Sequence, residues 1–227
     1  MKKILLIAAC GLMIFSGCSS MSNLAKGALI GTAGGATIGA AAGALIGGEK
    51  GAAIGAAIGT AVGAGAGAII GDKMDKKAAE LAELENAQVE TVEDANGLKA
   101  IKVTFDSGIL FATNSAKLSD KAKANLKTFA DDMKDLQDTD ITIYGHTDNT
   151  GSDAVNEKLS LQRANSVSTL LQNNGIAKSR ITAEGKSYSM PVATNETAEG
   201  RAQNRRVEVY ISANENMIKA AEEAAAK

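Results

Sequence analysis

A ladder of glycines is the feature that most constrains how this chain can fold. Glycine occupies every fourth position from residue 27 to residue 71, and Ala, Ile, Leu, Val and a few Thr fill most of the gaps. Because a helix turns every 3.6 residues, this spacing places the glycines in a slowly drifting stripe on one helix face. Another helix can approach such a stripe closely, as in the small-xxx-small packing of membrane helices. Each Gly costs about 1 kcal/mol relative to Ala in a helix in water. The ladder therefore predicts packed helices against lipid.

Two adjacent charges, Glu49 and Lys50, divide the ladder into halves. Each half has about twenty residues, which as a helix measures roughly 30 Å and matches a hydrocarbon core. We predict a helical hairpin over residues 27–71, similar to the glycine-zipper domains of bacterial envelope proteins. Whether it crosses the membrane, packs into oligomers at the interface, or is a low-complexity spacer stays open at this stage.

The N-terminus has the pattern of an export signal. Met1-Lys2-Lys3 is positively charged, and the apolar run 4–15 has the length of a signal-peptide core, too short to span a bilayer. The following Ser16-Gly17-Cys18 resembles a bacterial lipobox, although Phe15 stands where an aliphatic residue is usual. We expect a signal peptide over 1–17 and a lipidated linker over 18–26, with covalent lipid on Cys18.

Cys10 also fits a lipobox, but it would leave an apolar core of only about six residues, so Cys18 is preferred. Two or more acyl chains hold a protein on a membrane stably, whereas one chain binds reversibly. By similarity to enteric lipoproteins, Ser19 after the cysteine indicates the outer membrane. Both cysteines, Cys10 and Cys18, lie within the first twenty residues, so the sequence predicts neither a disulfide framework nor a Cys/His metal site. A net charge of -2 with 3% aromatic residues argues against nucleic acid as a partner.

The remaining chain has the pattern of an α+β domain. Residues 72–85 predict a solvated helical connector, and a folded domain is expected over 86–212. Alternating runs around Asn96-Gly97 predict a β-hairpin. Further strands are expected near 141–144, 180–184 and 206–212, and helices near 119–136, 154–173 and 197–203, with Val155, Leu159 and Val167 on the buried face of the second helix. Together they predict a mixed sheet covered by helices, followed by a frayed helical tail over 213–227.

Two charged residues suggest a binding site after the strand at 141–144. Asp148 lies in the turn that follows this strand, and Arg163 lies in the next helix. Asn156 is seven residues before Arg163, so both share a helix face, which need not be the buried one. An arginine presents a planar fork to a carboxylate, and an aspartate accepts from an ammonium, so the pair suits a ligand with both groups. The residues alone equally allow a structural ion pair.

A spaced motif identifies a family. Gly145-His146-Thr147-Asp148, Gly151, Asn156, Leu159-Ser160, Arg163-Ala164 and the later run 204–208 (Asn-Arg-Arg-Val-Glu) resemble the OmpA-like C-terminal domain. This family binds peptidoglycan non-covalently through the diaminopimelate of the stem peptide. The resemblance implies that Asp148 and Arg163 are the main ligand residues, that Thr147, Asn156 and Leu159 support them, and that Arg206 braces the site.

The chain as a whole resembles outer-membrane lipoproteins that combine a glycine zipper with an OmpA-like domain. We therefore expect a non-enzymatic tether between the outer membrane and peptidoglycan, lipid-anchored and with its C-terminal domain in the periplasm. No cofactor is expected. The lone histidine, His146, has no nucleophile or metal partner in the sequence that would make it catalytic. The alternative is an oligomeric pore or scaffold formed by the glycine zipper, with the wall domain as its anchor.

Overall fold

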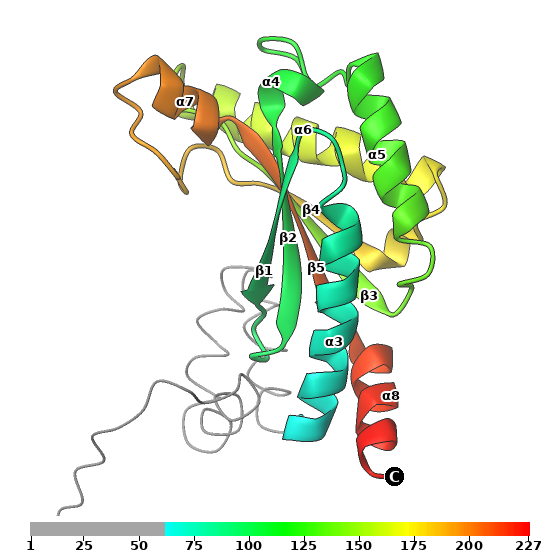
Figure 1. Cartoon of the computed structure of the whole chain (residues 1–227). Helices are drawn as coiled ribbons and strands as arrows, with labels where there is room; N and C mark the ends of the chain where they lie inside the picture. Colours follow the sequence, from blue (N-terminus) through cyan, green and yellow to red (C-terminus); the bar gives the residue numbers. More distant parts are fainter. Residues whose placement is uncertain (1–61) are drawn as a thin grey trace, which may run out of the picture.

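A five-stranded mixed sheet forms the centre of the structure (Figure 1). The structure is a computed structural model, and it describes residues 62–227. The strands are β1 (Ala87–Glu93), β2 (Lys99–Asp106), β3 (Thr139–Gly145), β4 (Ile181–Gly185) and β5 (Arg206–Ala213). Their order in the sheet is β1-β2-β5-β3-β4, with β3 and β4 parallel and the other neighbours antiparallel. The mixed sheet and its helices confirm the predicted α+β fold. The hairpin predicted for 27–71 falls mainly on residues 1–61, outside the described part, as do Cys18 and the signal sequence.

Helices connect the strands and extend both ends of the described chain. They are α3 (Ala64–Leu81), α4 (Ser107–Leu110), α5 (Asp120–Asp132), α6 (Asp153–Asn173), α7 (Ala198–Asn204) and α8 (Glu215–Ala225), with a 3-10 turn at Lys178–Arg180. The hydroxyl of Ser119 caps α5 by accepting from the backbone N–H of Ala122. In Figure 1, α7 lies at one end of the sheet and α3 runs beside α8 at the other.

One face of the sheet is apolar, and the main helices cover it. Strand β5 lies between β2 and β3, so each β5 residue has a partner on both sides. Val209, for example, lies opposite Val103 of β2 and Ile143 of β3. Side chains of α3, α5 and α6, among them Met74 and Phe129, complete this core. A fully buried side chain of this size contributes roughly 1.5–3 kcal/mol, so this layer dominates the stability of the fold.

The predicted β1–β2 hairpin is present. Gly97 adopts a positive φ of 69° in its turn, which explains the Asn-Gly signal. The carboxylate of Asp94 accepts from the backbone N–H groups of Asn96 and Leu98 and fixes the turn.

Helix α3 differs from the prediction of a solvated connector. It begins within the glycine ladder, and its residues Ile70, Met74 and Leu81 are fully buried in the core. Lys77, expected to be a solvent-facing charge, is buried and donates to the carbonyl oxygen of Asp132 at 2.8 Å. The packed unit therefore begins at α3 and not near residue 86. The sequence of α3 did not reveal its burial, because charged residues and alanines surround a narrow apolar stripe. Such a helix can be told from a solvated one only when the sheet that it covers is known.

The prediction of a frayed C-terminal tail is also wrong. Helix α8 is capped by Asn214, whose side chain accepts from the backbone N–H groups of Asn216 and Met217. Its residues Met217, Ile218 and Ala221 are buried, and the helix packs against α3. Within residues 62–227, no helix has the length and apolarity to cross a membrane.

Candidate functional site

The loop after β3 carries the predicted ligand residues, and its backbone is held on both sides. The N–H of His146 donates to the carbonyl of Arg206 at 2.9 Å, and the N–H of Thr147 donates to the carbonyl of Ser187 at 2.9 Å. These bonds continue the sheet beyond the end of β3, so the next residue starts from a fixed position.

Two glycines bring α6 close to the strands. Gly145 of β3 and Gly185 of β4 are paired in register. A Cβ on Gly145 would lie 2.1 Å from the carbonyl oxygen of Ser160, and one on Gly185 would lie 2.5 Å from its hydroxyl. Only glycine permits this approach. As a result, the inward face of α6 has room for small and polar side chains beside the loop.

The buried face of α6 differs from the prediction in the first turns of the helix, while Val167 and Leu171 are buried as predicted. Val155, expected in the core, is 55% exposed, and Leu159 is half-buried. Asn156 and Arg163 instead lie on the buried face together with Val167. The cause is the close approach at the two glycines, which leaves no space for large apolar side chains along the first turns of α6.

Asp148 is fixed and ionised within the loop. One carboxylate oxygen accepts from the N–H of Thr150 at 2.9 Å, and the other pairs with Nη1 of Arg205 at 2.5 Å. Burial alone would raise the pKa of Asp148, but the Arg205 guanidinium and the Thr150 N–H outweigh it and lower the pKa below its ordinary value. Gly151 completes the turn with a positive φ of 95°. The carboxylate is therefore held in one orientation, with both of its oxygens paired.

Asn156 connects α6 to this loop. Its side-chain amide donates to the carbonyl of Thr150 at 3.1 Å, and the residue is buried. Leu159 follows one turn later on the same side of the helix. Thr147 is buried, and its hydroxyl oxygen has no hydrogen-bond partner among the described residues. The structure thus places Asn156 as a loop anchor, and it buries the Thr147 hydroxyl without a hydrogen-bond partner among the described residues.

Arg163 is a buried cation with an incomplete set of partners. It is 4% exposed, its Nε donates to the carbonyl of Ser115 at 3.1 Å, and its guanidinium carbon lies 5.3 Å from the centre of the Phe111 ring. Within residues 62–227, no carboxylate lies within ion-pair distance of it. Burial, and secondarily the nearby Arg205 charge, lowers the pKa of Arg163, while Asp148 raises it. An arginine nonetheless remains charged at neutral pH.

The direct ion pair between Asp148 and Arg163, which the sequence left open, is not formed. Asp148 pairs with Arg205 instead. Arg205 belongs to the motif at residues 204–208, but the motif alone assigns it no role. Its position beside Asp148 depends on β5 pairing with β3, which places residues 57 positions apart in contact.

A second polar cluster braces the site from beneath. Arg206 donates from Nη2 to the carbonyl of Met190 at 3.0 Å and from Nε to Glu208 at 2.8 Å. Burial would raise the pKa of Glu208, but His146 and Arg206 lower it to about 2. His146 Nε2 lies 3.3 Å from Glu208, and burial lowers the pKa of this histidine below its ordinary value. Arg206 thus ties β5 to the loop before Pro191.

No group of three or more His, Cys, Asp or Glu side chains in the described part of the chain is arranged to hold a metal ion. The site is therefore built from one carboxylate, two guanidinium groups and the hydroxyl and amide groups around them. Such a set can bind a ligand that carries opposite charges a short distance apart.

Comparison with known proteins assigns the fold. Residues 110–205 match the OmpA family, and residues 1–75 match the YMGG-like Gly-zipper family. The chain is 43% identical over 109 residues to YfiB of Escherichia coli (strain K12), a protein named as a lipoprotein, covering 48% of this chain and 68% of that one. The chain belongs to the OmpA family.

Two further relatives extend this result. Outer membrane porin F of Pseudomonas aeruginosa is 44% identical over 123 residues, covering 53% of this chain. The chain spans only 35% of the length of that porin. Among solved structures, the cell wall anchor of the T6SS from Pseudomonas aeruginosa matches with a TM-score of 0.53 and 34% identity, covering 62% of this chain and 97% of the other. The relatives are outer-membrane proteins, lipoproteins and a wall anchor, and the match lies in the domain that carries the loop after β3.

Proposed function

We propose that this protein is an outer-membrane lipoprotein that tethers the membrane to the cell wall by non-covalent binding of peptidoglycan. Asp148 accepts from the side-chain ammonium of diaminopimelate in the stem peptide, and Arg163 binds the carboxylate on the same carbon. Thr147, Asn156 and Leu159 shape the site, and Arg206 braces it. Membership of the OmpA family and the similarity to a solved cell wall anchor support this role.

The observation that carries the proposal is the state of Arg163. Burying a cation without an anionic partner is costly, so a buried guanidinium with free donor groups favours binding of an anion. Its Nε is already occupied by Ser115, and Phe111 lies against its face, so the side chain is oriented before any ligand arrives. A carboxylate would complete this arrangement with charge-assisted hydrogen bonds.

The proposed anchor is covalent lipid on Cys18, with the C-terminal domain in the periplasm. A single small polar ligand buries little area, so each domain is expected to bind weakly. Several copies on one polymer increase the overall affinity through effective concentration. The proposed role is binding and not catalysis. Among the described residues, the buried ring nitrogens of His146 have no hydrogen-bond partner, so the histidine is not oriented toward a nucleophile that it could activate.

The test is co-sedimentation of the full-length protein, in mild detergent, with purified diaminopimelate-containing sacculi. We compare the wild type with Asp148→Asn and Arg163→Gln. The proposal predicts that both variants lose most of the sedimenting fraction while retaining the wild-type circular dichroism spectrum.

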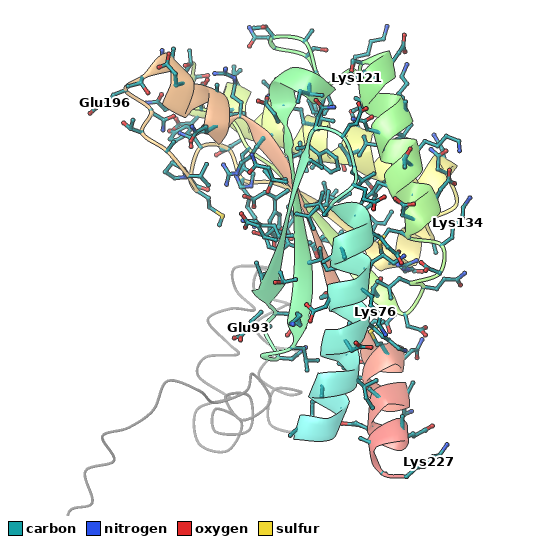
Figure 2. All side chains as sticks on the ribbon, viewed as in Figure 1. Lys76, Glu93, Lys121, Lys134, Glu196 and Lys227 are labelled. Carbon is teal, nitrogen blue, oxygen red and sulfur yellow. The ribbon has the colours of Figure 1, made fainter. Side chains whose placement is uncertain are left out.

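Matched controls come from an exposed ion pair on α3, Asp72 with Lys76. Lys76 is labelled on α3 in Figure 2. Asp72→Asn and Lys76→Gln change net charge by the same amounts as the site variants, and they should sediment like the wild type. Equal sedimentation of folded site variants and wild type would reject the assignment of the ligand pair. Absence of wild-type sedimentation would reject wall binding itself.

A further inference from the structure

Arg205 occupies the position that the ligand ammonium requires. Its Nη1 lies 2.5 Å from one carboxylate oxygen of Asp148, and the other oxygen accepts from the Thr150 N–H. A cation that binds Asp148 must therefore compete with a cation of the protein itself. Nothing in the sequence motif alone shows this, since Arg205 and Asp148 lie in separate elements.

The two guanidinium groups and the single carboxylate give the site a net positive charge. Asp148 and Arg205 neutralise each other, and the Arg163 charge remains without an ion-pair partner in the described part of the chain. Arg205 is close enough to Arg163 to lower the pKa of that group through charge repulsion. An incoming carboxylate therefore meets two cations that repel each other until an anion joins them.

We propose that Arg205 is a specificity-determining residue, which releases Asp148 only to a ligand that offers a carboxylate in exchange. A ligand with ammonium and carboxylate on one carbon gives Asp148 a new cation and gives Arg205 a new anion, which it shares with Arg163. A ligand with an ammonium alone displaces Arg205 and leaves two guanidinium groups without an anion. This inference rests on the binding function proposed above and assigns its selectivity for diaminopimelate over lysine to one residue.

The side chain of Arg205 has the freedom that this exchange needs. Its side chain is 40% exposed, compared with 10% for Asp148, and among the described residues its side chain forms an ion pair and hydrogen bond with Asp148 alone. Its backbone is fixed, because its carbonyl accepts from the N–H of Ser107 at 3.0 Å. The guanidinium can therefore move between carboxylates while the chain around it stays in place.

Asp148 does not need Arg205 to keep its orientation. The hydrogen bond from Thr150, together with the anchoring of Thr150 by Asn156, holds the carboxylate in the loop. Removing the Arg205 guanidinium should consequently leave a folded protein with an unpaired Asp148. This separates the proposed role from a purely structural one.

The experiment measures two dissociation constants for each variant by titration calorimetry of the full-length protein in detergent. The ligands are a stem tripeptide ending in meso-diaminopimelate and the same tripeptide ending in lysine, which has the ammonium without its neighbouring carboxylate. In Arg205→Gln, the diaminopimelate ligand loses a carboxylate partner and the lysine ligand no longer has to displace a cation. Both effects reduce the preference for diaminopimelate. The dissociation constant for the lysine peptide divided by that for the diaminopimelate peptide should therefore fall by at least about tenfold.

Arg205→Lys keeps the charge without the planar fork and should lose only part of the selectivity. Lys76→Gln removes a distant exposed charge and should preserve the wild-type ratio. A wild-type ratio in Arg205→Gln, alongside loss of binding in Asp148→Asn, would overturn the role of Arg205 and leave the wall-binding function in place. Failure of the wild type to bind either peptide would instead overturn the proposed function, and this inference with it.

Discussion

At the α3–α8 end of the domain, apolar side chains fill the contact between helices and sheet, whereas the buried side chains at the end of β3 are polar. Ile70, Leu81 and Ile218 represent the first region. Asp148 and Arg163 represent the second. Apolar burial favours folding with no required partner, while each buried polar group costs free energy unless it is paired. The comparison indicates that the α3–α8 end stabilises the fold. This stability offsets the cost of burying polar groups in the proposed binding site after β3.

The largest expected effect lies in the polar cluster beneath the loop. Glu208→Gln leaves the buried Arg206 without its anion and should destabilise the protein by roughly 3–5 kcal/mol at pH 7. Because the folded pKa of Glu208 is depressed to about 2, its contribution is fully present above its ordinary pKa of 4.5 and is lost as pH falls toward 2.

Chemical denaturation of wild type and variant between pH 7 and pH 3 checks this prediction. The difference in free energy of unfolding between the wild type and Glu208→Gln should shrink below pH 4.5. Glu90→Gln is the control, since Glu90 pairs with Lys102 on the same sheet and its side chain is exposed. If this difference in free energy of unfolding stayed constant over the whole pH range, it would contradict the assigned role of the Glu208 charge.

A core truncation at the other end should destabilise without affecting binding. Leu81→Ala removes a fully buried side chain of α3 and is expected to cost roughly 2–5 kcal/mol. Thermal unfolding measures the loss, and Lys73→Ala on the exposed side of the same helix should change little. Sacculus binding by the folded protein should match the wild type. If folded Leu81→Ala lost wall binding, the two regions would not be separable as described.

Gly145→Ala tests the close approach that positions α6. The new Cβ would overlap the Ser160 carbonyl, so α6 must shift, at an expected cost of roughly 1–3 kcal/mol. The shift displaces Asn156 and Arg163 from the loop, so binding should fall even in the folded fraction. Titration with the diaminopimelate tripeptide, at a temperature where the variant is folded, measures this. Unchanged affinity would show that the helix position does not set the site.

The smallest effect concerns a glycine of the ladder itself. A Cβ on Gly71 would come no closer than 4.0 Å to the Lys99 side chain, so α3 has room for alanine there. Gly71→Ala should stabilise the protein by roughly 0.5–1 kcal/mol through helix propensity and reduced entropy of the unfolded chain. A lowered melting temperature would mean that this glycine is needed for packing in the domain, in contrast to Gly145.

Local patterns predicted much of the fold. The alternating runs around Asn96-Gly97 gave the β1–β2 hairpin, and the limits expected for α6 are within a residue of those observed. These features depend on residues that are near one another in the chain. The covered faces of α3 and α8 do not, because their mixture of alanine and charge fits a solvated helix until the neighbouring element is known.

The site shows the same division. The spaced motif identified Asp148, Asn156 and Arg163, all of which the structure gathers around one loop. It did not reveal that Val155 faces solvent, because periodicity assigns apolar residues to the core and the glycines of β3 and β4 reverse this. Nor did it reveal the Asp148–Arg205 pair, which is created by strand pairing over a long sequence separation.

The most direct test of the wall-binding site is a structure of the full-length protein with the diaminopimelate tripeptide bound. We predict the ligand ammonium on the Asp148 oxygen that Arg205 occupies in the free protein, and the ligand carboxylate on the terminal nitrogens of Arg163. A peptide bound elsewhere, with the Asp148–Arg205 pair intact and Arg163 unchanged, would contradict the proposed site.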